Sequence, residues 1–183
     1  EMPRTRPYGR LAVRPEAVSL ALRELAPEDD HKGEFAAFLD WAYAENIAPQ
    51  IILYDRNDLD RLIGWVADST LDGSRLSVLY VLGRYTTGQR SNPVDLLSFL
   101  GTESLPFRDW MICAFGPSES QCAALAALLG GHVRVGFENN IYMPDGAVAP
   151  NNAALLHETA SMLKSLRLDL ATADDVRALW RIG

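Results

Sequence analysis

The 183-residue chain is 48% hydrophobic and 22% charged, which is ordinary for a globular domain. Its net charge of −7, from 24 acidic and 17 basic residues, argues against a nucleic-acid-binding protein, which needs a basic face to displace the counterions of the phosphate backbone. The two cysteines, Cys113 and Cys122, give no disulfide framework, and no signal peptide or membrane-length apolar stretch is visible, so we expect a cytoplasmic protein.

Short apolar runs alternate along the chain with amphipathic or capped stretches of helical length. In chain order they predict a strand at 17–22, a helix at 33–46, a strand at 50–54, a helix at 58–68, a strand at 76–82, a helix at 93–100, a strand at 110–115, a helix at 118–129, a strand at 132–137, and helices at 151–165 and 172–180. Near-continuous apolar runs are typical of parallel strands that are buried on both faces. The alternation therefore predicts βαβ units around one parallel sheet.

Three polar residues stand where helix caps are expected. Asn92 precedes Pro93, Ser118 precedes the acidic Glu119, and Thr172 precedes the start of the last helix. We expect the side chain of each cap to accept a hydrogen bond from the first turn of its helix.

Five βα units are too few to close a (β/α)8 barrel, which typically needs about 250 residues. Residues 1–183 therefore form a single α/β domain that is either an open doubly wound sheet or the C-terminal part of a barrel. The chain begins at Glu1 rather than at a methionine, which suggests that further residues precede it. In both architectures ligands bind beyond the carboxyl ends of the strands.

Polar residues follow each of the first three strands. Glu24 is either a ligand or base, or an acidic residue at a helix start. Tyr54 is either a substrate contact or a half-buried core residue, and Asp55 could equally cap the next helix. Residues 83–88 could cradle a phosphate through backbone N–H groups, with Arg84 and Arg90 nearby for charge, although they match no Walker or dinucleotide-binding fingerprint.

Residues 130–142 are the most informative stretch of the chain. A glycine pair is followed by an apolar run that contains Arg134 and ends in Glu138, Asn139 and Asn140. Residues four apart on a strand point to the same side, so Arg134 and Glu138 should share one face. The pair is either part of an active site or a structural ion pair, and residue types alone do not decide between them.

The histidines and cysteines give no support for a metal site built from the histidines of these residues or for nucleophilic hydrolysis. His31, His132 and His157 lack the spacing of metal ligands. No histidine-based triad or paired catalytic cysteine is present, so nucleophilic hydrolysis has no support.

The run Gly-Gly-His-Val-Arg-Val-Gly-Phe-Glu at 130–138 resembles the final strand and loop of the β-keto acid cleavage enzymes, whose founding activity is 3-keto-5-aminohexanoate cleavage. Val81-Leu82-Gly83 resembles the sixth strand end of that family, and residues 146–155 resemble its closing loop and helix. The resemblance implies a (β/α)8 barrel of the TIM type, of which this chain covers about strands four to eight.

The resemblance also implies a zinc-dependent reaction in which a β-keto acid and acetyl-CoA give acetoacetate and a new CoA ester. Glu138 would be a zinc ligand, with two histidines from an early strand that is absent from these residues. Arg134 would position and charge the catalytic group. Asn139 falls where the family has an acid–base aspartate, and an amide cannot take a proton near neutral pH. Another group, with Glu24 a candidate, would then be the base.

From their place at the carboxyl ends of the strands we expect Tyr54, Gly83, Arg84 and Asn140 to contact the substrate. The partners would be a small β-keto acid and a CoA ester, with no nucleic acid and no membrane. Because a partial barrel exposes apolar strand edges, we also expect a homo-oligomer.

Two other hypotheses remain open. One is a non-catalytic, shortened relative that keeps the scaffold and binds a small anionic ligand. The other is an unrelated α/β enzyme that binds a phosphorylated ligand at residues 84–88.

Overall fold

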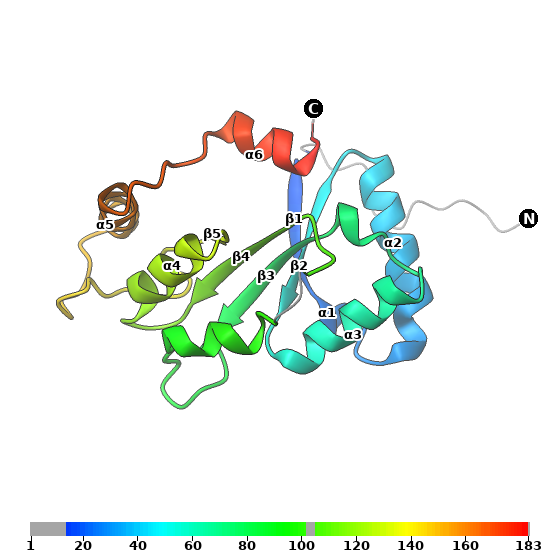
Figure 1. Ribbon diagram of the computed structural model, residues 1–183, viewed down its shortest axis with the longest axis horizontal. Helices are drawn as coiled ribbons and strands as arrows, with labels where there is room; N and C mark the ends of the chain where they lie inside the picture. Colours follow the sequence, from blue (N-terminus) through cyan, green and yellow to red (C-terminus); the bar gives the residue numbers. More distant parts are fainter. Residues whose placement is uncertain (1–13, 102–104, 183) are drawn as a thin grey trace, which may run out of the picture.

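Within residues 14–101 and 105–182, which the computed structural model describes, five β-strands form one parallel sheet (Figure 1). The strands are β1 (Ala17–Ala21), β2 (Ala48–Leu53), β3 (Ser77–Leu82), β4 (Asp109–Ala114) and β5 (His132–Val133). Their order in space is their order in the sequence, and every neighbouring pair is parallel. The predicted parallel sheet is therefore confirmed.

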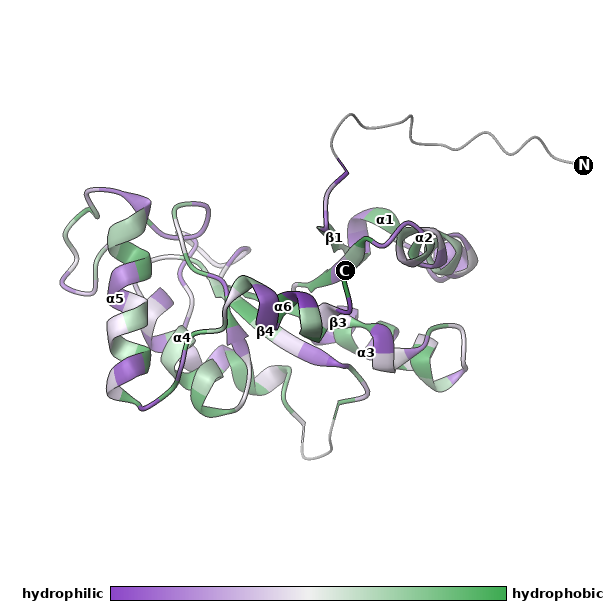
Figure 2. Ribbon diagram, turned by 90° about the horizontal axis from the view of Figure 1, so that it is seen from above, coloured by the Kyte–Doolittle hydropathy of each residue, from purple (hydrophilic) through white to green (hydrophobic). Residues whose placement is uncertain are grey.

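The connections between the strands are mostly helical, as the alternation predicts. The α-helices are α1 (Leu22–Leu25), α2 (Lys32–Ala44), α3 (Arg56–Ala67), α4 (Glu119–Leu128), α5 (Asn152–Ser165) and α6 (Ala173–Trp180), and the 3₁₀ helices are η1 (Asp29–His31), η2 (Gly73–Arg75) and η3 (Pro93–Ser98). Helix α5 buries one side through Leu155, Thr159 and Leu163, while hydrophobic and hydrophilic residues alternate along it (Figure 2).

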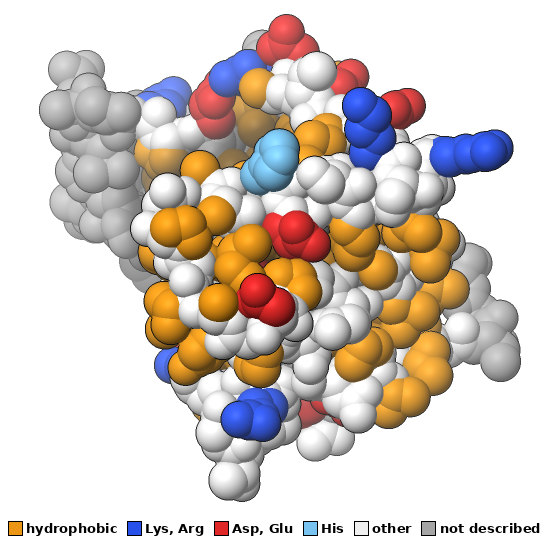
Figure 3. Space-filling view, turned by 90° about the vertical axis from the view of Figure 1, so that its left-hand side faces the viewer, with side chains coloured by type: hydrophobic (Ala, Val, Ile, Leu, Met, Phe, Trp, Pro, Cys, Tyr) orange, Lys and Arg blue, Asp and Glu red, His pale blue; other side chains and the backbone are white. Residues whose placement is uncertain are grey.

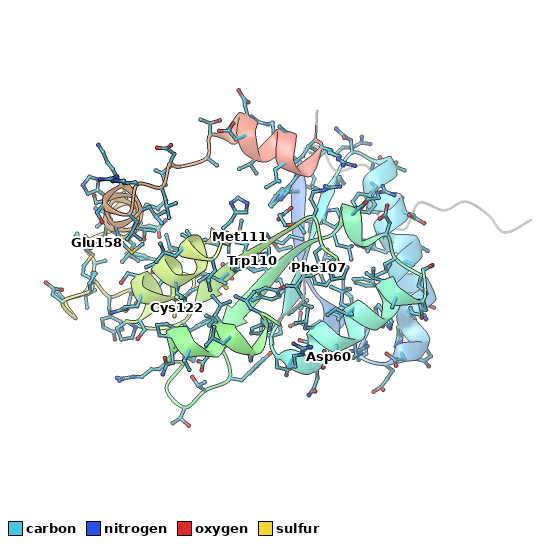
Figure 4. The ribbon with its side chains drawn as sticks, in the orientation of Figure 1. Asp60, Phe107, Trp110, Met111, Cys122 and Glu158 are labelled. Atoms are coloured by element: carbon cyan, nitrogen blue, oxygen red, sulfur yellow. The ribbon has the colours of Figure 1, made fainter. Side chains whose placement is uncertain are left out.

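One face of the sheet, which we call the helix-packed face, carries the main core. Ile51, Tyr80 and Ile112 from three neighbouring strands are buried there with side chains of α2, α3, η3 and α4. Apolar residues along these connecting helices turn one stripe inward, and burial of that stripe is the main force that holds helix and sheet together. Trp110 of β4 also packs on this face (Figure 4).

The opposite face, which we call the second face, carries a smaller apolar cluster. Leu79, Val81, Cys113 and Phe115 form it, with Met111 of β4 packed alongside (Figure 4). Successive residues of a strand point to opposite faces, so β4 sends Trp110 and Met111 to different sides of the sheet.

A row of polar residues crosses the second face near the amino ends of the strands. Ser19, Gln50, Ser77 and Asp109 occupy consecutive register positions on β1 to β4. The Ser19 hydroxyl donates to Gln50 at 3.0 Å, and the Ser77 hydroxyl donates to Oδ1 of Asp109 at 2.5 Å. In the described part of the chain the buried Oδ2 of Asp109 has no hydrogen-bond partner.

The last predicted strand, 132–137, is wrong in its length. Strand β5 ends at Val133, although the N–H of Arg134 still donates to the carbonyl of Ile112 at 2.8 Å. The chain then turns at Gly136, whose φ is +144°, and the N–H groups of Asn139 and Asn140 both donate to the Gly136 carbonyl. The apolar alternation of 133–137 is therefore interrupted by a turn that periodicity does not reveal.

The helix starts give a mixed result. Asn92 and Thr172 cap their helices in capping boxes, as expected, but the predicted helix at 93–100 is the 3₁₀ helix η3. Asp55 caps α3 by accepting from the N–H of Asp58 at 3.1 Å. The cap at Ser118 is wrong, because this residue is not extended (ψ 10°) and its hydroxyl makes no cap hydrogen bond.

Candidate functional site

Three loops at the carboxyl end of the sheet are hydrogen-bonded to one another. Ser91, in the loop after β3, donates from both its N–H and its hydroxyl to the carbonyl of Phe115 at 2.8 Å each. The N–H of Gly116, which follows β4, donates to the carbonyl of Asn139 at 3.1 Å. These bonds fix the loop after β3 on the end of β4, and the end of β4 on the turn after β5.

Between these loops lies a cleft of about 560 Å³, which we call the first cleft. Arg90 from the loop after β3, Phe115 from the end of β4, and Glu138, Asn139 and Tyr142 from the turn after β5 are among the residues that line it. Its polar groups therefore come from three successive strand ends, which is where an open or closed α/β sheet binds its ligands.

Glu119, in the first turn of α4, holds the turn that carries Glu138 and Asn139. Its Oε1 accepts from the N–H of Gly136 at 3.0 Å, and its Oε2 accepts from Nδ2 of Asn140 at 3.1 Å. The side chain is buried (the residue is 2% exposed), and burial raises the pKa of its carboxyl above the ordinary value, although the two donors act in the opposite direction. The carboxylate thus clamps both ends of the turn.

Sequence reasoning placed Glu119 only as an acidic residue at a helix start. An acidic residue in the first turn is ordinary for any helix, so nothing in the local pattern distinguishes this carboxylate from a solvent-exposed one. Its role depends on contacts with residues 17 and 21 positions further along the chain.

Arg134 and Glu138 approach each other, but not as neighbours on one strand. Glu138 lies in the turn, with a side chain that is 76% exposed, and its Oε2 is 3.5 Å from Nη2 of Arg134. The shared face that the spacing predicted is therefore wrong as strand geometry, while the ion pair itself is present. An ion pair that is this exposed adds little to stability.

The guanidinium of Arg134 lies on the second face of the sheet. Its Nη2 is 3.6 Å from Sγ of Cys113, and its Nε is buried without a hydrogen-bond partner in the described residues. Burial raises the pKa of the Cys113 thiol to about 11, with Arg134 opposing the shift, so this cysteine is a neutral apolar neighbour. The Arg134 side chain as a whole is 31% exposed, so an anionic ligand could engage the accessible part of its guanidinium.

A second group of charges gathers at the ends of β1 and β2. Nη2 of Arg23 is 2.6 Å from Asp55 and 2.7 Å from the buried Asp58, and its guanidinium lies 5.0 Å from the ring centre of Tyr54. Burial raises the pKa of Asp55, but hydrogen bonds from Arg23 and from the backbone of Asp58 outweigh it and lower that pKa below its usual value. Sequence reasoning missed Arg23 and Asp58 because they meet only through the β1–β2 register.

The ring of Tyr54 packs against that of Tyr85 in a tilted arrangement, with ring centres 5.1 Å apart and an interplanar angle of 59°, and burial raises the pKa of Tyr54. Together with Gly83 and Arg84, these two tyrosines line a second cleft of about 590 Å³. Gly83 has φ +80°, and a Cβ there would lie 2.5 Å from the backbone nitrogen of Ser91, so this position requires glycine.

The structure therefore divides the predicted site residues. Tyr54, Gly83 and Arg84 line the second cleft, and Glu138, Asn139 and Asn140 line the first cleft. Glu24 is exposed on the short helix α1 and lines neither of these two clefts.

The two amides that follow Glu138 differ in how far hydrogen bonds hold their side chains. Asn140 is committed to the fold, because its Nδ2 also donates to the Tyr142 carbonyl at 2.8 Å and its Oδ1 accepts from the Tyr142 N–H at 2.9 Å. Asn139 is buried, and its carbonyl accepts from Gly116. It lines the first cleft, and among the described residues no hydrogen bond holds its side-chain amide, so Asn139 is the amide better placed to meet a ligand there.

Among the described residues, no group of three or more histidine, cysteine, aspartate or glutamate side chains is arranged to hold a metal ion. Over the same residues, no helix has the length and apolar character needed to cross a membrane.

Comparison with known proteins gives a consistent set of relatives. A family model described as beta-keto acid cleavage enzyme matches residues 2–182. The chain is 32% identical over 134 residues to a 3-keto-5-aminohexanoate cleavage enzyme of Fusobacterium nucleatum, covering 73% of this chain and 47% of that protein. It is 27% identical over 180 residues to a 3-oxoadipate:acetyl-CoA acetyltransferase of Cupriavidus necator, covering 93% and 62% respectively. The chain thus spans roughly half of the first relative and three-fifths of the second.

Proposed function

This chain belongs to the family of beta-keto acid cleavage enzymes, and on that premise we propose that it is the C-terminal part of an enzyme that condenses a β-keto acid with acetyl-CoA. The products would be acetoacetate and the CoA ester of the remaining acyl group. The names of several relatives, among them the acetyltransferase of Cupriavidus necator, include acetyl-CoA. The five-stranded sheet would form about strands four to eight of a (β/α)8 barrel, for which its parallel, sequential order gives support.

The observation that carries this proposal is the grouping of Arg134, Glu138 and Asn139 at one end of the sheet. We assign Arg134 to the substrate, where its guanidinium would stabilise negative charge on the carboxylate or on the enolate that forms when the carbon–carbon bond breaks. Its partly exposed side chain leaves the guanidinium accessible for this role. Asn139 would orient the substrate by donating and accepting hydrogen bonds, since its amide cannot take a proton.

The proton transfers then need a different base. Glu24, the candidate from the sequence, is exposed on α1 and lies outside the first cleft. We therefore propose that the base is either Glu24, brought closer by residues outside this chain, or a group supplied by those residues. Tyr54, Gly83, Arg84 and Asn140 remain proposed contacts, the first three at the second cleft and Asn140 as a support of the turn.

We further propose that the complete enzyme depends on zinc, with Glu138 as one ligand. The described residues do not supply a complete site, because no group of three or more histidine, cysteine, aspartate or glutamate side chains among them could hold a metal ion. The histidine ligands would come from residues outside this chain. Zinc would act there as a Lewis acid toward the keto group.

The full-length protein should also form a homo-oligomer. Large apolar side chains, including Leu128 (60% exposed), Val148 (65%) and Leu156 (50%), lie at the surface. Hydrophobic side chains recur over the side of the molecule that carries α5 (Figure 3). Contiguous exposed apolar surface favours association. We place the enzyme in the cytoplasm, a proposal that rests on its soluble, CoA-dependent substrates.

The experiment is an assay of the full-length protein with acetyl-CoA and a panel of β-keto acids. The expected products are acetoacetate and a new CoA ester in equal amounts, identified by mass spectrometry. A protein that carries its metal and is folded, yet forms neither product from any of the panel, would contradict the proposal.

A second candidate function is a non-catalytic relative that retains the scaffold and binds a small anion. The amide at Asn139 favours it, because the acid–base group of the family resemblance is missing. Asn139→Asp discriminates between the two: an enzyme should keep or gain turnover, whereas a non-catalytic relative should stay inactive.

A further inference from the structure

The loop after β3 carries two arginines beside the first cleft. Arg90 lines the cleft directly, and the guanidinium of Arg84, which lines the second cleft, lies 5.3 Å from the ring centre of Phe115, a residue that lines the first. Neither guanidinium has a carboxylate partner among the described residues, while most other arginines of these residues are paired with aspartate or glutamate.

The loop is held in place and is not a loose surface segment. The Thr86 hydroxyl donates to the carbonyl of Arg90 at 2.7 Å and accepts from the N–H of Arg90 at 2.9 Å. Ser91 is bonded twice to Phe115. Gly116 has φ +81°, and a Cβ there would lie 2.8 Å from the Gln89 carbonyl and 3.5 Å from Cα of Arg90. The backbone of Arg90 is thus fixed against the end of β4.

The walls of the first cleft have two characters. Phe115, Phe137 and Tyr142 give it apolar surface, Arg90 gives it positive charge, and Glu138 and Asn139 from the turn after β5 also line it. A ligand that fits would have an apolar or amide-containing arm that leads from a reacting group to an anionic end. A CoA ester has this shape, since a pantetheine arm separates its thioester from a phosphorylated nucleotide.

We infer that the first cleft binds the CoA ester, with Arg90 engaging its phosphates and Arg84 assisting from above Phe115. This inference rests on the proposed function for the identity of the ligand. The phosphate-bearing end would lie on the loop after β3, and the thioester would point toward Asn139 and Glu138. Guanidinium groups form paired, charge-assisted hydrogen bonds with phosphate oxygens, which suits this assignment.

The test compares Arg90→Ala with wild type in the full-length protein, using acetyl-CoA and acetyl-pantetheine, a thioester without the nucleotide and its phosphates. We expect the KM for acetyl-CoA to rise about tenfold, the size of one charge-assisted contact, with kcat unchanged. The KM for acetyl-pantetheine should not change. Arg90→Lys should recover part of the loss, and Lys164→Ala, an exposed cation near the end of α5, is the control.

Direct binding of CoA, measured by calorimetry, separates this inference from the proposed function. Binding that weakens about tenfold in Arg90→Ala supports the subsite even in a protein that shows no turnover. Turnover in which Arg90→Ala leaves the KM for acetyl-CoA unchanged, or raises both KM values equally, overturns the subsite and leaves the proposed function standing. Absence of CoA binding by the folded wild type overturns the subsite as well.

Discussion

The two faces of the sheet use the same strands for different purposes. The helix-packed face is a continuous apolar core from β1 to β5, covered by α2, α3, η3 and α4. The second face has only a small apolar cluster, a polar row near the amino ends of the strands, and Arg134 near the carboxyl ends. Burial of apolar area stabilises the first face, whereas the second face places polar groups where burial is costly without partners.

The two faces should therefore respond differently when a side chain is removed. Removal of a side chain from the helix-packed face should mainly destabilise the fold. Removal of a polar group from the carboxyl end of the second face should mainly affect chemistry, because those groups contribute little to packing. Glu119 joins the two, since it begins a helix of the first face and holds the turn that serves the second.

The largest effect is expected at Glu138. In the full-length protein, Glu138→Gln should lower turnover by about 10³, because loss of a carboxylate ligand removes several kcal/mol of charge stabilisation. Zinc content should fall with it, while the melting temperatures of the zinc-free variant and the zinc-free wild type should agree, because the side chain is exposed. Metal analysis and an activity assay measure both, with Asp169→Asn as the control. Tight, stoichiometric zinc binding by residues 1–183 alone that survives Glu138→Gln would show the ligand assignment to be wrong.

Arg134→Ala should lower turnover by about 10²–10³ and leave the fold intact, the range found when one preorganised donor is removed from an active site. Stability should change little, since its ion pair with Glu138 is exposed and its Nε is unpaired. Steady-state kinetics and thermal unfolding are the measurements, with Lys164→Ala as the control. If Arg134→Ala lowers the melting temperature while its folded fraction keeps normal turnover, the role of Arg134 is structural.

The sequence was sufficient for the architecture because burial on both faces leaves a direct mark on it. Runs such as 76–82 and 110–115 are apolar at consecutive positions, which distinguishes parallel strands from amphipathic ones. Caps at Asn92 and Thr172 were equally readable, because each involves residues three positions apart. The barrel itself stays a prediction.

The site was less predictable because its contacts join distant residues. The end of β5 is set by Glu119, which takes the N–H of Gly136, and the alternation of 133–137 carries no sign of that bond. Similarly, Arg23 meets Asp58 across 35 residues through the β1–β2 register. Periodicity reports what a residue buries, but not which distant polar group it bonds.

Two adjacent isoleucines of β2 test the difference in packing directly. Ile51 is fully buried on the helix-packed face, and Ile52 is partly buried on the second. Ile51→Ala should lower the free energy of unfolding of this chain by about 2–5 kcal/mol. Ile52→Ala should lower it by about 1–2 kcal/mol, since less apolar area is lost. Urea unfolding measures both. Equal losses would mean that the second face is packed as tightly as the first.

The smallest effect concerns the pH dependence that Glu119 contributes. Burial raises the pKa of this carboxyl in the folded state, so the folded chain holds its proton more tightly than the unfolded chain does. The free energy of unfolding should therefore fall as pH rises from the unfolded value, about 4.3, through the folded pKa, by about 1.4 kcal/mol for each unit between them. In Glu119→Gln this decline should disappear.

Glu34→Gln, which changes an exposed carboxylate in the first turn of α2, is the matched control and should keep the decline. Urea unfolding between pH 4 and 7 is the measurement. A decline that persists in Glu119→Gln would mean that another titratable group causes it. Burial of the Glu119 carboxyl would then cost no more free energy than a contact at the surface.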